Sequence, residues 1–180
     1  MSLRLFLAHR PPPPIRALLL ESMGDVPGAR WQDEDQVHLT LRFIGEIARP
    51  LAEDLADQLD RVRAASFPLA IAGVGHFERK GRPHTLWAGV SASQPLALLH
   101  TRIERACRAA GLPPEPRQFT PHITLARLNA ASASPAHFIA AHGRLASAPW
   151  LVDSFDLMES RLGNAGASYE TLARYRLAAG

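Results

Sequence analysis

The sequence feature that most constrains the fold is a repeated tetrapeptide, HLTL at 38–41 and HITL at 122–125, in a chain of 180 residues. Both copies lie in stretches rich in β-branched and aromatic residues, which are typical of strands. A random order of the same residues gives about 0.04 matches to His-x-Thr-Leu, so chance does not account for two matches. The chain is therefore expected to contain two similar strands that each present the same pair of polar side chains.

Alternation along a strand says which side chains share a face. His38 and Thr40 project to one side, whereas Leu39, Leu41 and Phe43 project to the other. The second copy repeats this arrangement. Each strand is thus predicted to offer an apolar face to the core and an imidazole–hydroxyl pair to whatever lies opposite.

The remaining pattern predicts an α+β protein with mainly antiparallel sheets, because hairpin-linked strands alternate with amphipathic helices. No stretch reads as a domain linker, so residues 1–180 are expected to form one domain. Strands are expected at 3–8, 36–45, 67–78, 84–92, within 113–128, at 150–160 and at 168–177, and helices at 15–23, 48–65, 95–111 and, weakly, 135–143.

Composition limits the compartment and the partners. A single cysteine, Cys107, rules out an internal disulfide and suits the cytoplasm. No apolar run approaches the ~20 residues of a membrane span, so a soluble protein without membrane association is expected. The net charge is +3, and Lys80 is the one lysine among 20 cationic residues. This mildly basic, arginine-rich chain is compatible with a phosphorylated or nucleic-acid partner, and the basic turn 79–83 is either a solvated tip or a guide for an RNA backbone.

Two facing His-x-Thr pairs would suit in-line displacement at phosphorus. With an ordinary pKa near 6.5, one imidazole can be neutral and accept a proton while the other is protonated and donates one. Threonine hydroxyls can donate hydrogen bonds to the non-bridging oxygens. This chemistry requires no metal or other cofactor.

The paired motifs resemble those of the two-histidine (2H) phosphoesterases, and specifically the RNA 2′,3′-cyclic phosphodiesterase, or 2′-5′ RNA ligase, family. The resemblance runs nearly end to end and includes RLFLA, VHLTLRFIGE, GHFERKGRPHTLWAGV, FTPHITLAR and LMESRLGNAGASYETLARYRL. It implies a bilobal, pseudo-two-fold fold in which two sheets line a central cleft and helices lie outside. It also implies metal-independent hydrolysis of RNA 2′,3′-cyclic phosphate ends to 2′-phosphates, by a monomer with no protein partner.

The resemblance also assigns site residues. It implies His38 as proton donor and His122 as proton acceptor, with Thr40, Thr124 and Arg127 on the phosphate and Phe43 as a substrate contact. Simple alternation, however, places Arg127 and Phe43 on the face opposite the histidines, from which they reach the cleft only if the strands twist, bulge or end. Alternation instead nominates Arg42 as the cation facing the cleft.

Other readings of the chain remain. Family members that join RNA ends make ATP-independent 2′-5′ ligation one alternative, and a protein that binds RNA ends without turnover is another. A zinc site is the main rival chemistry, but the chain has no H-E-x-x-H motif and no paired cysteines. The intact pair of histidines favours an enzyme, because binding a phosphate would need only arginine or lysine.

Overall fold

Two lobes of antiparallel sheet and four helices make up the chain. The computed structural model describes all of residues 1–180 and confirms the expected α+β class. The helices are α1 (Pro13–Ser22), α2 (Arg49–Leu59), α3 (Gln94–Ala109) and α4 (Ala136–His142). The strands are β1 (Ser2–His9), β2 (Arg30–Trp31), β3 (Leu39–Ala48), β4 (Phe67–Leu69), β5 (Ile71–Arg79), β6 (Arg82–Val90), β7 (His122–Arg127), β8 (Trp150–Val152), β9 (Ser154–Gly163) and β10 (Gly166–Arg176).

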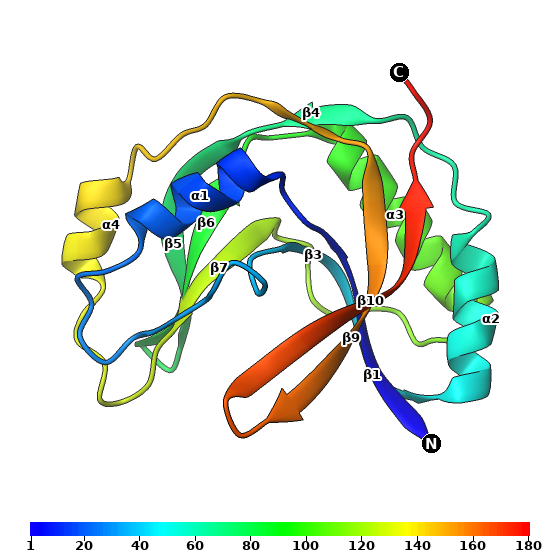
Figure 1. The fold of residues 1–180 in the computed structure, drawn as a ribbon, viewed down its shortest axis with the longest axis horizontal. Coiled ribbons are helices and arrows are strands. Elements are labelled where there is room, and N and C mark those ends of the chain that lie inside the picture. Colours follow the sequence, from blue (N-terminus) through cyan, green and yellow to red (C-terminus); the bar gives the residue numbers. More distant parts are fainter.

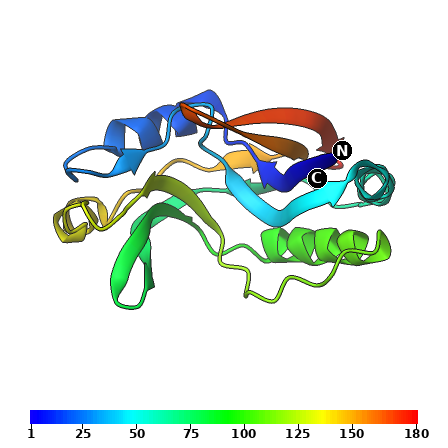
Figure 2. The ribbon, with the colours of Figure 1, turned by 90° about the horizontal axis from the view of Figure 1, so that it is seen from below.

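The main sheet has the order β10-β9-β1-β3-β7-β6-β5, with β2 also paired to β7. The two histidine strands, β3 and β7, are neighbours at its centre, and they meet through one residue pair, Leu39 opposite Ile123. This narrow junction divides the sheet into two halves that can splay apart. Figures 1 and 2 show the result, with the β9–β10 hairpin on one half and the β5–β6 hairpin on the other.

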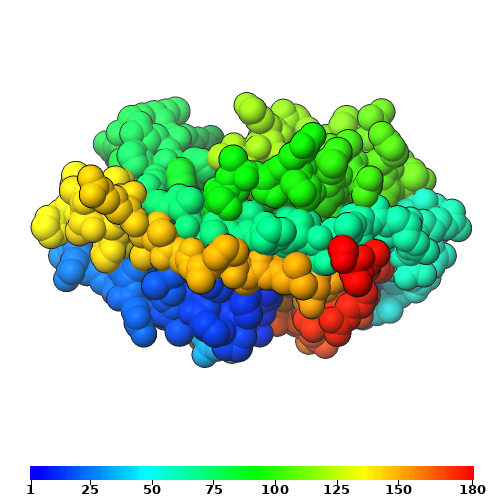
Figure 3. Space-filling model, turned by 90° about the horizontal axis from the view of Figure 1, so that it is seen from above, coloured from blue at the N-terminus to red at the C-terminus, as the bar shows by residue number.

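The two lobes share one core. A single cluster of 34 buried residues draws on both half-sheets and all four helices. Helices α2 and α3 pack against each other and against β3, outside the sheet. In Figure 3 the central part of the sequence gathers on one side and the two terminal parts on the other, and the segment containing α4 and β8 runs along their junction. No helix is long and apolar enough to cross a membrane.

Three details of the strands differ from the sequence expectation. Strand β2 is a two-residue element that was not expected, and it forms because Arg30 and Trp31 pair with the end of β7. The stretches expected as single strands at 67–78 and 150–160 each split in two. In both cases the first piece leaves the main sheet, because β4 and β8 pair with each other as a separate two-stranded sheet.

Arg42 does not face the cleft as simple alternation predicted. Its side chain turns toward α3, where the residue is 8% exposed and forms ion pairs with Glu104 and Glu115. It also donates a hydrogen bond to the carbonyl of Pro113 (2.7 Å). The expectation was wrong because β3 contains an extra residue at Leu41: Ala8 of β1 lies opposite Thr40, but the preceding Leu7 lies opposite Arg42. The buried arginine therefore has a structural role, tying β3 to α3 and to the loop that leads into β7.

Replacing Arg42 by alanine should lower the free energy of unfolding by about 3 kcal/mol, because it leaves the partly buried Glu104 without a cation. Glu115 would keep only the exposed Arg117 as its partner. Urea unfolding at pH 7 measures the change. Arg79→Ala is the matched control, since Arg79 is exposed on β5 and makes no ion pair; it should change the stability by less than about 0.5 kcal/mol. Equal stability of the two variants would contradict this role for Arg42.

Candidate active site

A cleft of about 770 Å³ opens between the β9–β10 hairpin, β2 and the two histidine strands. All six site residues named from the sequence line it: His38, Thr40, Phe43, His122, Thr124 and Arg127. Four arginines and one acidic residue also lie in its wall, namely Arg4, Arg30, Arg117, Arg127 and Asp33. The cleft thus combines two imidazoles with an excess of positive charge.

A bulge in β3 brings Phe43 to the cleft. The register with β1 pairs Ala8 with Thr40 and Phe6 with Phe43, so the extra residue between them reverses the alternation of side chains. In an antiparallel pair, opposed residues project from the same face. Phe43 therefore shares the face of Thr40, although simple alternation placed it on the other side.

The second histidine strand contains a matching bulge. In the pairing of β6 with β7, Trp87 lies opposite Thr124 but Leu86 lies opposite Ala126, so Leu125 is the extra residue. The next pair is Thr85 with Arg127. Arg127 is thereby turned to the cleft by the same device, at the same distance from its histidine, as Phe43.

Both imidazoles are held by the same backbone hydrogen bond. His38 Nδ1 lies 2.6 Å from the carbonyl oxygen of Gln36, and His122 Nδ1 lies 2.6 Å from that of Thr120. Because a carbonyl oxygen can only accept, each Nδ1 carries the proton. Nε2 is then the nitrogen that accepts a proton in the neutral ring and donates one in the imidazolium.

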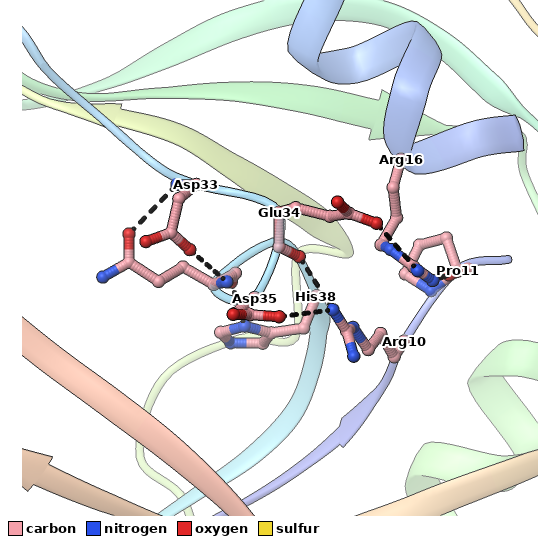
Figure 4. A network of polar contacts seen from close by, with 8 residues as sticks. Arg10, Pro11, Arg16, Asp33, Glu34, Asp35 and His38 are labelled. Carbon is pink, nitrogen blue, oxygen red and sulfur yellow. Dashed lines mark hydrogen bonds and ion pairs between the residues drawn. The ribbon is translucent and has the colours of Figure 1, made fainter. Parts of the chain in front are cut away.

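The loop before His38 is tied to the residue that follows β1 and to α1. Arg10 donates to the Asp35 carboxylate (3.1 Å), and Arg16 donates to that of Glu34 (3.1 Å). Asp33 closes the loop by accepting from the backbone N–H of Gln36 (2.9 Å). Figure 4 shows these contacts beside the imidazole of His38. They fix the backbone that supplies the carbonyl partner of His38.

Aromatic rings flank each histidine, and the sequence did not predict them. The ring of His38 lies 5.0 Å from that of Phe6 and 5.3 Å, edge on, from that of Tyr169. His122 lies 4.7 Å, edge on, from Phe77. The aromatic partners come from β1, β10 and β5, so only the tertiary fold brings them to the motifs. Their sequence signal, an apolar residue in a strand, does not differ from that of a core position.

Burial lowers the pKa of both histidines. For His38 the burial effect dominates, the Gln36 carbonyl opposes it, and the charges of His122 and Arg127 add to it, bringing the pKa to about 4. The pKa of His122 is also lowered, first by burial and then by Arg127, against the effect of the Thr120 carbonyl. Each histidine is therefore neutral near pH 7 in the free protein, and Arg127 is close enough to influence both.

A second cavity of about 380 Å³ adjoins the cleft beside Thr40 and His122. Phe43 stands at the boundary and is 47% exposed, with the guanidinium of Arg117 6.0 Å from its ring centroid. Phe119 contributes a further wall and stacks on His100 at 3.9 Å. The cavity is thus an aromatic extension of the cleft. No three His, Cys, Asp or Glu side chains in the molecule are grouped so that they could hold a metal ion.

This chain is similar to known proteins of one family. Residues 11–164 match the model of the 2′-5′ RNA ligase superfamily. A protein of Aeropyrum pernix named RNA 2′,3′-cyclic phosphodiesterase is 33% identical over 149 residues, covering 81% of this chain and 85% of its own. One of Thermus thermophilus with the same name is 34% identical, covering 97% of this chain and 90% of its own.

Solved structures share the fold. The crystal structure of TT0787 of Thermus thermophilus superposes with a TM-score of 0.82 at 27% identity, covering 98% of this chain and 99% of that one. The apo form of E. coli LigT gives a TM-score of 0.80 at 25% identity, covering 98% of both chains.

The imidazole of His38 should titrate with a pKa near 4 in the free protein, and that of His122 below 6.5, because both are withdrawn from water. NMR detection of the histidine ring carbons between pH 3.5 and 8 measures both values, with His38→Gln and His122→Gln identifying the signals. A His38 pKa at or above 6.5 would show that the aromatic enclosure does not exclude water from it.

Proposed function

The chain belongs to the 2′-5′ RNA ligase superfamily, and we propose that it hydrolyses RNA 2′,3′-cyclic phosphate ends to 2′-phosphomonoesters without a metal ion. The observation that carries the proposal is the symmetric placement of His38 and His122 in one cationic cleft, each with Nδ1 on a backbone carbonyl and Nε2 left for proton transfer. The names of the relatives supply the substrate class.

In the proposed reaction a water oxygen attacks phosphorus while the bond from phosphorus to O3′ breaks. The base takes a proton from the water, and the acid gives one to O3′, so the products are a 2′-phosphate and a 3′-hydroxyl. Following the family resemblance, we assign the acid to His38 and the base to His122. His38 is neutral in the free protein, and the negative phosphate beside it is what favours its protonated form in the complex.

Three cleft residues are assigned to the phosphate. Thr40 and Thr124 each lie two residues beyond a histidine, on the same face, and their hydroxyls can donate to the non-bridging oxygens. Arg127 adds a charged donor that makes no ion pair with the protein. Donors from both half-sheets would hold the phosphorus between the two imidazoles, in line with the attacking and leaving oxygens.

Phe43 and Arg117 are assigned to the nucleoside. An exposed ring with a guanidinium over it at the mouth of an aromatic cavity is suited to a stacked base. The charges in this second cavity balance, since its two acids, Glu78 and Glu115, are matched by Arg42 and Arg117. It is therefore better suited to an uncharged nucleoside than to a phosphate, which the main cleft attracts.

Joining of RNA ends is the second candidate, favoured by the space on both sides of the phosphate position. With the nucleoside of the cyclic phosphate in the second cavity, a 5′-hydroxyl entering along the main cleft could replace water as the nucleophile, giving a 2′-5′ linkage from the same two proton transfers. A protein that only binds RNA ends would need the arginines and threonines but not a pair of enclosed imidazoles.

Replacing either His38 or His122 by alanine should reduce kcat by about 10²–10⁴-fold, the typical contribution of a general acid or base. The assay uses a short RNA with a 2′,3′-cyclic phosphate end in excess EDTA, and separates 2′-phosphate, 3′-phosphate and joined products. We expect 2′-phosphate from the unaltered chain only.

His76→Ala is the control, since His76 pairs with Glu78 on the β5–β6 hairpin and lies outside the cleft. It should retain activity. Activity lost on chelation would contradict the metal-free mechanism. Bound but unaltered RNA would identify an end-binding protein.

The pH dependence of kcat/KM should be bell-shaped, with its maximum between pH 4 and 6.5. The active form of the free enzyme carries one proton on the histidine pair. Lowering the pH through the pKa of His38, about 4, adds a second proton to the pair, and raising it through the lowered pKa of His122 removes the first. In the free enzyme the single proton lies mostly on His122, and the bound phosphate favours the reactive form in which His38 carries it and His122 is neutral. Both limbs of the pH profile therefore lie at lower pH than they would for two histidines with ordinary pKa values.

The measurement covers pH 3.5–9, with circular dichroism at each pH to confirm that the protein stays folded. The kcat profile should lie at higher pH, because bound phosphate favours the imidazolium. A kcat/KM maximum above pH 7 would contradict the neutral state assigned to the free histidines.

A further inference from the structure

Arg127 is held differently from most other tethered arginines of this protein. Arg42, Arg161 and Arg174 each pair with a carboxylate, and so do Arg10, Arg16, Arg117 and Arg176. Arg127 has no acidic partner. Its one side-chain hydrogen bond runs from Nη1 to the hydroxyl oxygen of Thr85 (2.9 Å).

Thr85 is a buried hydroxyl in the neighbouring strand. It is 1% exposed and lies directly opposite Arg127 in the pairing of β6 with β7. Its oxygen has a second partner in His84, whose Nδ1 is 2.7 Å away. A buried polar group normally has a hydrogen-bond partner, and both partners of this one are side chains at the cleft. The hydroxyl is therefore committed to the site and not to the core.

We propose that Thr85, with His84 behind it, is a positioning residue that fixes the guanidinium of Arg127 for phosphate without neutralising its charge. This inference rests on the proposed function, in which Arg127 binds the phosphate. Without this hydrogen bond the exposed side chain of Arg127 would sample several rotamers, and binding of the substrate would have to bear the entropy cost of ordering it. Tethering one nitrogen in advance leaves the other N–H donors free.

A carboxylate in place of Thr85 would hold Arg127 more strongly, but it would weaken the attraction of Arg127 for a phosphate. A bidentate carboxylate occupies two donors of the fork and cancels the charge that a phosphate requires. The hydroxyl of Thr85 takes one hydrogen bond from the guanidinium and carries no charge. The charge of Arg127 in fact reaches both histidines, since it contributes to the lowered pKa of each. The neutral tether therefore preserves the electrostatic effect of Arg127 throughout the cleft.

The test compares Thr85→Val, which keeps the shape and loses the hydroxyl, with Thr85→Ser, which keeps the hydroxyl. Each is made in the unaltered chain and in an Arg127→Ala background. Two readouts are taken: kcat/KM on the cyclic-phosphate RNA, and the Kd of inorganic phosphate from isothermal titration. Thermal unfolding verifies that all variants are folded.

We expect Thr85→Val to lower kcat/KM by about tenfold and to weaken phosphate binding, and Thr85→Ser to stay within about threefold of the unaltered chain. With Arg127 already replaced, Thr85→Val should have no further effect, because the two residues act as a unit. Equal losses in both backgrounds, or no loss in either, would overturn the inference. If the unaltered chain does not hydrolyse the RNA, the proposed function fails, and the phosphate affinities still decide the role of Thr85.

Discussion

The geometry of the cleft depends on one extra residue in each of two antiparallel strands. In a regular strand the side chain five positions after a histidine lies on the opposite face. The bulges at Leu41 and Leu125 reverse this alternation, so that Phe43 and Arg127 join the histidine–threonine pairs on the cleft side. The same reversal sends Arg42 in the other direction, where it pairs with Glu104 of α3 and with Glu115 of the following loop. The bulge at Leu41 thus accounts both for Phe43 in the cleft and for the buried position of Arg42 behind it.

The two halves use this common backbone frame for different purposes. The bulged strand of one half presents a phenylalanine to the cleft, and that of the other presents an arginine. The residue opposite on the neighbouring strand differs accordingly. Phe6 lies opposite Phe43, with ring centroids 6.4 Å apart, whereas Thr85 lies opposite Arg127 and accepts a hydrogen bond from it. A symmetric scaffold thereby yields an asymmetric cleft, with a phenylalanine on one side and an arginine on the other, which suits the proposed nucleoside and phosphate positions.

The sequence predicted the element types, the α+β class and the family, because strand alternation, helical spacing and the repeated motif are local signals. It did not predict the bulges, since the leucines concerned do not differ from ordinary core positions. The split of β4 from β5 and the partners of Arg42 depend on residues distant in the chain. The aromatic rings around the histidines were missed for the same reason. The residues that line the cleft could be named from the motifs and the family resemblance, but the reason that Phe43 and Arg127 reach it required the strand register.

The histidines and Arg127 place different electrostatic demands on the cleft. The imidazoles are partly withdrawn from water, whereas the guanidinium of Arg127 is exposed and keeps its charge. Partial burial, together with the charge of Arg127, lowers the pKa of each imidazole, so both rings are neutral near pH 7. An arginine paired with a carboxylate in the same cleft would weaken the attraction for an anion. The site avoids this conflict by using neutral groups, two backbone carbonyls and one hydroxyl, to orient its three key side chains. Neutral supports thus orient His38, His122 and Arg127 without cancelling the positive charge of the cleft, as the proposed binding of a phosphate requires.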